Sequence, residues 1–112
     1  MFKDFVMRYR PTFDPVLHDL NFIVQGGMKI GVVGRTGAGK SSILQALFRL
    51  VEKDQNGGYI EIDGIDISKV GLTTLRESLA IIPQSPFLFI GSIKENLDPF
   101  GLYTMQDLWQ AL

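Results

Sequence analysis

Cysteine is absent from this chain of 112 residues, which excludes a disulfide framework and a thiolate metal site. Neither sign of charge is in excess, because 11 basic and 12 acidic residues leave a net charge of -1, so we expect no nucleic-acid partner. No apolar run approaches the roughly 20 residues of a membrane-spanning helix, and the first residues do not resemble a signal peptide. The 46% hydrophobic content is therefore expected in a core or an interface, and the length suits one small domain.

The sequence does contain a glycine-rich loop with the complete spacing of a Walker A phosphate-binding motif. Its residues are Gly34, Arg35, Thr36, Gly37, Ala38, Gly39, Lys40, Ser41 and Ser42. Glycines allow a tight turn whose N–H groups point at an anion, Lys40 supplies a cation for the β- and γ-phosphates, and the Ser41 hydroxyl is placed to ligate Mg²⁺. A buried strand is predicted before the loop, at residues 29–33, and a helix after it, at residues 42–50. These flanks argue against the alternative, a glycine-rich turn that matches by chance.

Alternating and periodic apolar patterns predict the remaining elements. Strands are expected at residues 5–10, 20–24, 59–62 and 80–82, with a short edge at 65–67. Helices are expected at residues 73–79 with Thr73 or Thr74 as N-cap, at residues 92–97, and from Thr104 with Asp107 completing the cap. The helix after the loop is expected to bury one face, formed by Ile43, Leu44, Leu47 and Phe48.

Further motifs extend the pattern over nearly the whole chain. They are residues 7–11 (Met-Arg-Tyr-Arg-Pro), 31–42 around the loop, 62–64 (Ile-Asp-Gly), 81–84 (Ile-Ile-Pro-Gln) and 96–100 (Asn-Leu-Asp-Pro-Phe). In order and spacing the chain resembles the nucleotide-binding domain of ATP-binding-cassette (ABC) proteins, above all subfamily C, the multidrug-resistance-associated exporters. The later motifs are similar to the second nucleotide-binding domain of such transporters. The resemblance implies an α/β fold of the P-loop NTPase type with an N-terminal antiparallel β part. Residues 1–112 would form its Walker A and Q-loop half.

The resemblance also assigns roles outside the loop. Tyr9 matches the aromatic residue that stacks on adenine, whereas the strand pattern alone would place it on an apolar face with Phe5 and Met7. Gln84 matches the Q-loop glutamine, which reaches Mg²⁺ and the attacking water; the alternative is a solvated loop amide. The resemblance thus implies Lys40 and Gln84 as catalytic residues, Ser41 and Gln84 as metal ligands, and Tyr9 with residues 34–42 as the ATP contacts. It assigns no individual role to Arg35.

Several motifs of the family do not occur in the chain: the signature loop Leu-Ser-Gly-Gly-Gln, the Walker B aspartate with the catalytic glutamate, and the switch histidine. We therefore expect the complete protein to hydrolyse ATP. This truncated part is expected only to bind ATP with Mg²⁺. The family implies export across a membrane, with a second nucleotide-binding domain and transmembrane domains as partners at the cytoplasmic face. The alternatives are the nucleotide-binding domain of an ATP-gated channel or channel regulator, and a non-functional remnant.

The predicted sheet is expected to be incomplete. In the family, strands that come later in the sequence lie between the strand before the loop and the strand before Gln84. Residues 29–33 and 80–82 would then lack neighbours and expose apolar surface. Phe87, Leu88 and Phe89 are expected at an interface with the membrane domains rather than in a core.

Overall fold

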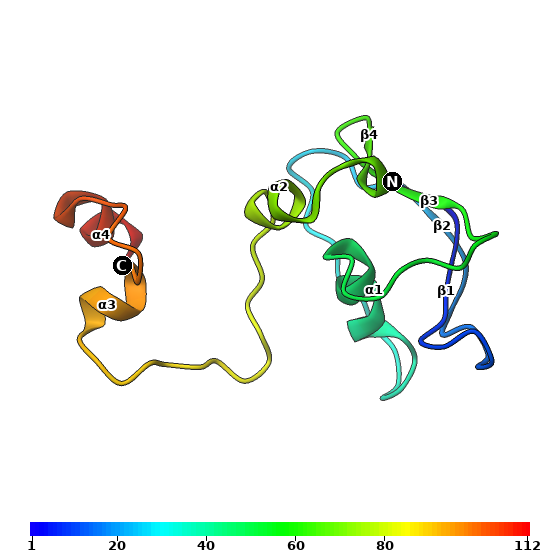
Figure 1. Cartoon of the computed structure of the whole chain (residues 1–112), viewed down its shortest axis with the longest axis horizontal. Helices are drawn as coiled ribbons and strands as arrows, with labels where there is room; N and C mark the ends of the chain where they lie inside the picture. Colours follow the sequence, from blue (N-terminus) through cyan, green and yellow to red (C-terminus); the bar gives the residue numbers. More distant parts are fainter. The chain divides into compact units, whose positions relative to one another are not determined.

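The computed structural model describes residues 1–112 as two units, Met1–Ala80 and Ile81–Leu112. A four-stranded sheet with the order β2-β1-β3-β4 organises the first unit. Its strands are β1 (Phe2–Met7), β2 (Leu17–Phe22), β3 (Tyr59–Ile62) and β4 (Ile65–Asp66), and each neighbouring pair is antiparallel (Figure 1). The predicted antiparallel β part is therefore confirmed, with the first two strands beginning about three residues earlier than expected.

An irregularity in β1 decides which side chains reach the core. Asp4 has a φ of 48°, and the pairing with β2 shifts between Phe2 and Phe5 and again between Phe5 and Met7. A β-bulge of this kind changes the face to which the following side chains point. Phe2, Phe5 and Met7 are consequently all buried, although their spacing is not a strict alternation. The predicted continuation of the strand to Arg10 is wrong, because the backbone bends from residue 9 onward to reach β2.

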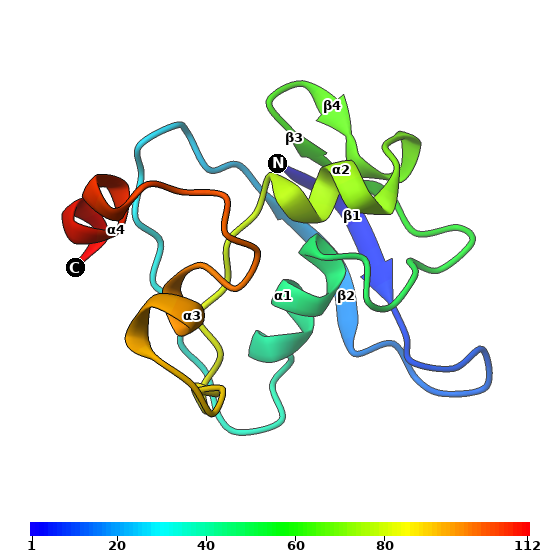
Figure 2. The same ribbon diagram turned by 60° about the vertical axis from the view of Figure 1, so that its left-hand side comes forward.

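The core joins the sheet to helix α1 (Lys40–Leu47), which lies beside β1 and β2 (Figure 2). Its buried apolar residues are Phe2, Phe5, Met7, Leu17, Ala46, Ile60, Ile67 and Leu75. The most buried residues of α1 are small, Ser42 and Ala46, and half-buried Ile43 and Leu47 complete the contact. The expected burial of Leu44 is wrong, because 45% of this residue is exposed. Small side chains on the inner face allow the helix axis to approach the sheet closely.

A short 3₁₀ helix, η1 (Ile67–Lys69), and helix α2 (Leu72–Glu77) follow β4. Asp66 caps η1 by accepting a hydrogen bond of 2.9 Å from the Ser68 N–H. Hydrogen bonds from Ser68 lower the pKa of the Asp66 carboxyl below its ordinary value. The N-cap of α2 is Gly71, which makes no side-chain cap bond, so the expected cap at Thr73 or Thr74 is wrong. The helix begins at Leu72, which places both threonines inside its first turn.

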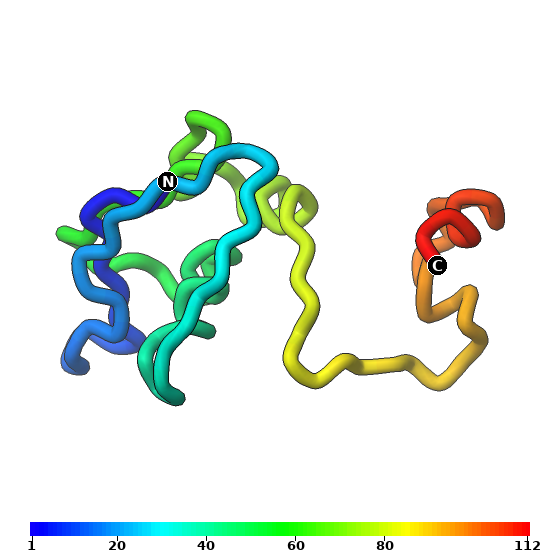
Figure 3. Tube along the Cα trace, turned by 180° about the vertical axis from the view of Figure 1, so that it is seen from behind, coloured from blue at the N-terminus to red at the C-terminus, as the bar shows by residue number.

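The two strands predicted at residues 29–33 and 80–82 do not form. No strand forms between β2 and α1, and the cyan segment in Figure 3 shows the course of the chain there. A strand requires a neighbour for its N–H and C=O groups, and neither segment has one within the chain. The expected exposure of apolar residues there is confirmed, since Val33 and Ile82 are each 94% exposed.

The second unit contains helices α3 (Ile93–Leu97) and α4 (Met105–Ala111). Ser92 caps α3 in a capping box with Glu95, and Thr104 caps α4 in a capping box with Asp107, which confirms both predicted N-termini. Hydrogen bonds from the cap residues lower the pKa of the Glu95 and Asp107 carboxyls.

Between these helices, Asp98 accepts hydrogen bonds of 2.9 Å from the N–H groups of Leu102 and Tyr103. These bonds lower the pKa of the Asp98 carboxyl. Phe87, Leu88 and Phe89 are exposed and take no part in a core, while their expected interface with membrane domains stays a prediction. None of the helices of the chain has the length and apolar character needed to cross a membrane.

Candidate phosphate-binding site

The glycine-rich loop folds around the ammonium group of Lys40. Lys40 Nζ donates hydrogen bonds to the carbonyl oxygens of Gly34, at 2.6 Å, and Arg35, at 2.7 Å. The Ala38 N–H donates to the same Arg35 carbonyl at 3.1 Å, which closes the bend of the loop. An ammonium group has three N–H donors, so one donor of Lys40 is available to a ligand held in the loop.

Two glycines of the loop lie in the left-handed region, with φ of 82° at Gly37 and 83° at Gly39. Residues with a side chain rarely adopt this conformation. Gly39 has a second constraint, because a Cβ there would lie 3.1 Å from the Val16 carbonyl oxygen and 3.1 Å from Leu17 Cδ2. A Cβ at Gly37 would meet nothing within 4 Å. Gly39 therefore seats the end of the loop against the start of β2, while Gly37 only allows the turn.

The first turn of α1 carries both serines of the motif. Ser41 is exposed, and Ser42 is buried with its Oγ 2.9 Å from Tyr9 Oη. The Ser42 and Ile43 N–H groups donate to the Gly39 carbonyl at 3.0 and 3.2 Å, which fixes the start of the helix at the loop. Tyr9 is 47% exposed, so the interpretation that it belongs to the buried face of β1 is wrong. Its role in adenine stacking stays a prediction.

The first unit thus brings most of the predicted site together. Gly34, Arg35, Thr36, Gly37 and Ala38 are exposed, Gly39 is buried, and Lys40 is half-buried. Tyr9 joins them through its hydrogen bond to Ser42. Gln84 is exposed and belongs to the second unit, so its role toward the loop stays a prediction.

An open depression of about 540 Å³ lies beside Tyr9. Its lining comes from two stretches, Arg8 to Pro11 and Val51 to Asn56. Arg8 and Asp54 form an ion pair between the two stretches. No sequence signal predicted this pair, because Arg8 belongs to the motif at residues 7–11 whereas Asp54 belongs to no motif and lies 46 positions further along the chain.

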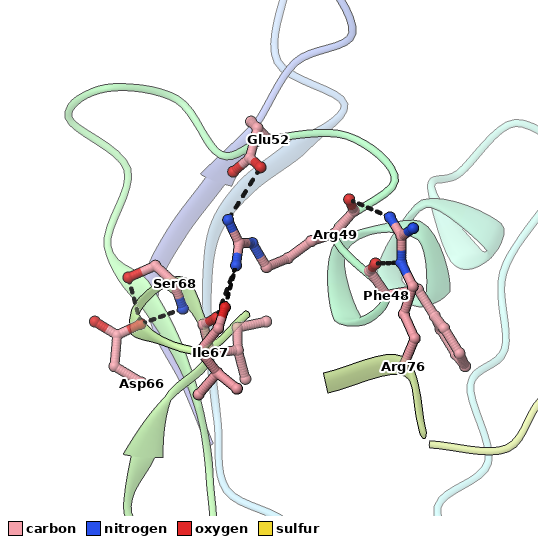
Figure 4. A network of polar contacts seen from close by, with 8 residues as sticks. Phe48, Arg49, Glu52, Asp66, Ile67, Ser68 and Arg76 are labelled. Carbon is pink, nitrogen blue, oxygen red and sulfur yellow. Dashed lines mark hydrogen bonds and ion pairs between the residues drawn. The ribbon is translucent and has the colours of Figure 1, made fainter. Parts of the chain in front are cut away.

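Two arginines hold the opposite end of α1 (Figure 4). Arg76, from α2, donates to the carbonyls of Phe48 at 3.1 Å and Arg49 at 3.2 Å. Arg49 donates to the carbonyls of Ile67 at 3.1 Å and Val70 at 2.9 Å, and to the Glu52 carboxylate at 3.2 Å. Cations at a helix C-terminus satisfy carbonyls that have no partner within the helix. These contacts link α1 to the segments that follow the sheet, and the only sequence signal for them was a basic residue just beyond the helix.

The loop, its lysine and the following helix place the protein in the class of phosphate-binding-loop proteins. Comparison of sequences gives the family: the sequence profile of the ABC transporter family matches residues 17–112, and the chain belongs to this family. The chain is 52% identical to ATP-binding cassette sub-family C member 3 of Homo sapiens over 111 residues. The matched region covers 99% of the chain and 7% of that protein.

Two further relatives carry similar names. ABC transporter C family member 8 of Dictyostelium discoideum is 54% identical over 112 residues, covering 100% of the chain and 7% of that protein. The ABC-type transporter cicA of Emericella nidulans is 57% identical over 111 residues, covering 99% of the chain and 8% of that protein. The resemblance to subfamily C is confirmed, and the chain spans only 7 to 8% of the length of these relatives.

Proposed function

We propose that the chain binds ATP through residues 34–42, with the adenine ring on Tyr9. The observation that carries this proposal is the position of the Lys40 ammonium group, held on the Gly34 and Arg35 carbonyls inside the bend of the loop. A cation in this place neutralises the β- and γ-phosphates, and the loop N–H groups supply further donors. Tyr9 lies next to the first turn of α1 and presents an exposed ring on which a purine can stack.

The same loop suits Mg²⁺ only in company with a nucleotide. His, Cys, Asp and Glu residues form no group of three or more that could hold a metal ion. Mg²⁺ in phosphate sites takes few protein ligands and fills its coordination with phosphate oxygens and water. The exposed Ser41 hydroxyl at the start of α1 supplies one such ligand. When bound there, the ion neutralises phosphate charge.

For the whole protein, we propose the nucleotide-binding part of a subfamily C exporter. Residues 1–112 would form the Walker A and Q-loop half of its second nucleotide-binding domain. That domain would pair with another nucleotide-binding domain and with transmembrane domains at the cytoplasmic face. Gln84 would contact Mg²⁺ and the attacking water, and ATP hydrolysis would drive export. The chain by itself would bind ATP without turnover. The names of the relatives support this proposal.

Photolabelling of the purified chain with 8-azido-ATP tests the binding site. We expect labelling that excess ATP suppresses, and a loss of at least tenfold in Lys40→Ala, because the variant leaves the phosphate charge unpaired. Lys69→Ala is the matched control, since it removes a lysine that lies outside the loop and is mostly exposed. Equal labelling of the wild-type chain and Lys40→Ala would contradict the proposal.

A further inference from the structure

Arg8 joins three segments around Tyr9. Its guanidinium forms the ion pair with Asp54, in the stretch between α1 and β3. The same guanidinium donates a hydrogen bond of 3.0 Å to the Phe13 carbonyl, in the turn between β1 and β2. Tyr9 is the next residue in the chain. One side chain therefore fixes the backbone on which Tyr9 stands to two separate parts of the first unit.

Tyr9 depends on this support because the sheet does not hold it. β1 ends at Met7, so Tyr9 takes no part in strand pairing. Tyr9 is 47% exposed, and its Oη forms a hydrogen bond with Ser42 Oγ. A ring that stacks on a base must be held in one orientation before the ligand arrives, or the cost of ordering it reduces affinity.

Asp54 is a firm anchor although it lies between secondary structure elements. Its own N–H donates to the Val6 carbonyl at 3.0 Å, and the Gly58 N–H donates to the Asp4 carbonyl at 2.8 Å. These bonds attach the stretch before β3 to the edge of β1. The Arg8 and Asp54 side chains are 32% and 20% exposed, so water screens their attraction less than that of a pair on the open surface.

We propose that Arg8 and Asp54 are positioning residues for Tyr9, so that the ion pair sets affinity for the adenine base and leaves affinity for the phosphates unchanged. This proposal rests on the proposed ATP site and adds to it a determinant of base recognition. The phosphate contacts belong to residues 34–42, whose hydrogen bonds involve neither Arg8 nor Asp54. One hydrogen bond, between Tyr9 Oη and Ser42 Oγ at 2.9 Å, joins the two parts of the site, and the Arg8–Asp54 pair lies on the side of the base.

The test compares two ligands, ATP and inorganic tripolyphosphate, which shares the phosphate chain and lacks the base. Calorimetric titration of the full chain gives the dissociation constant of each in the presence of Mg²⁺. For Asp54→Asn and Arg8→Gln, we expect ATP affinity to fall about three- to tenfold, the range that a well-placed aromatic stack contributes, with tripolyphosphate affinity unchanged. Glu52→Gln is the matched control, because Glu52 lies in the same stretch and pairs with Arg49 instead.

The exchanged pair, Arg8→Asp with Asp54→Arg, is expected to recover part of the lost ATP affinity. Equal losses for both ligands would assign the pair a general structural role, and unchanged ATP affinity would remove it from base recognition; either result overturns the proposal. Should Arg8→Gln fail to fold, Arg8→Lys keeps the cation and is expected to show a smaller loss for ATP alone. A failure of the ATP site itself is distinct, because Lys40→Ala would then leave both affinities unchanged.

Discussion

Replacing either of two loop glycines by alanine separates backbone strain from close packing. Gly37 and Gly39 have almost the same φ, 82° and 83°, so an alanine suffers the same left-handed strain at both positions. Only at Gly39 would the new Cβ meet other atoms, the Val16 carbonyl oxygen and Leu17 Cδ2, each at 3.1 Å. The pair of variants is thus an internal control for the anchoring of the loop to β2.

The expected magnitudes follow from these two terms. Left-handed strain on a residue with a Cβ costs about 1 to 2 kcal/mol. Gly37→Ala should therefore lower the free energy of unfolding by about 1 to 2 kcal/mol. Forcing an extra carbon against a backbone oxygen adds an overpacking cost of about 1 to 3 kcal/mol. Gly39→Ala should lower the free energy of unfolding by about 2 to 5 kcal/mol in total.

Urea unfolding followed by circular dichroism measures the difference between the variants, and amide exchange in α1 reports on the first unit specifically. We expect a lower urea midpoint for Gly39→Ala than for Gly37→Ala, with exchange accelerated at the first turn of α1 and at Leu17. Equal midpoints and equal exchange would refute the inference that Gly39 anchors the loop. The glycine would then serve only to permit the turn.

Three further predictions concern the caps, the acid limit and the end of α1. Thr104→Ala should destabilise α4 by about 1 kcal/mol, because it removes the cap, whereas Thr73→Ala should destabilise α2 by less than about 0.5 kcal/mol. Circular dichroism of helix content in urea measures both effects, and equal effects would contradict the observed caps. The lowered pKa of Asp98 contributes stability that is complete above the ordinary carboxyl pKa, about 3.9, and is lost as pH falls through the lower folded value. Circular dichroism should show this loss of stability as the pH of the wild-type chain falls. If Asp98→Asn has the same acid transition as the wild type, Asp98 does not contribute to it. Arg76→Met should weaken α1 by about 1 kcal/mol by removing two hydrogen bonds to its end, and unaltered amide exchange in α1 would argue against this role.

Local sequence signals predicted an element correctly where all of its hydrogen-bonding partners lie within a few residues of one another. The capping box at Thr104 and Asp107 joins residues three positions apart, so its spacing predicted the start of α4 correctly. The strand expected at residues 59–62 and the short edge expected at residues 65–67 likewise form β3 and β4, which are joined by a turn at Asp63 and Gly64 with φ of 50° and 80°. By contrast, the predicted cap at Thr73 or Thr74 failed, because the helix begins at Leu72.

Elements that depend on distant partners were predicted less well. Apolar composition alone predicted strands at residues 29–33 and 80–82, but a strand also requires a neighbour, and no other segment of the chain pairs with them. The bulge at Asp4 was not predicted, because the strand expected at residues 5–10 began one residue after it, whereas β1 begins at Phe2. At the site, the motif gave the loop residues, while the pairing of Arg8 with Asp54 required the fold.

The phosphate loop is consequently held from one side. Its C-terminal side continues into α1, which packs on β1 and β2 through Ala46 and is fixed to β2 by Gly39. Its N-terminal side continues from residues 29–33, where Val33 is 94% exposed and no strand pairing restrains the backbone. A ligand that contacts both sides of the loop must order residues 29–33 as it binds, and this loss of conformational entropy reduces affinity. Any strand that pairs with residues 29–33 should therefore increase the affinity for nucleotide without contacting it. The pairing would order these residues before the nucleotide binds, which the antiparallel sheet does not do.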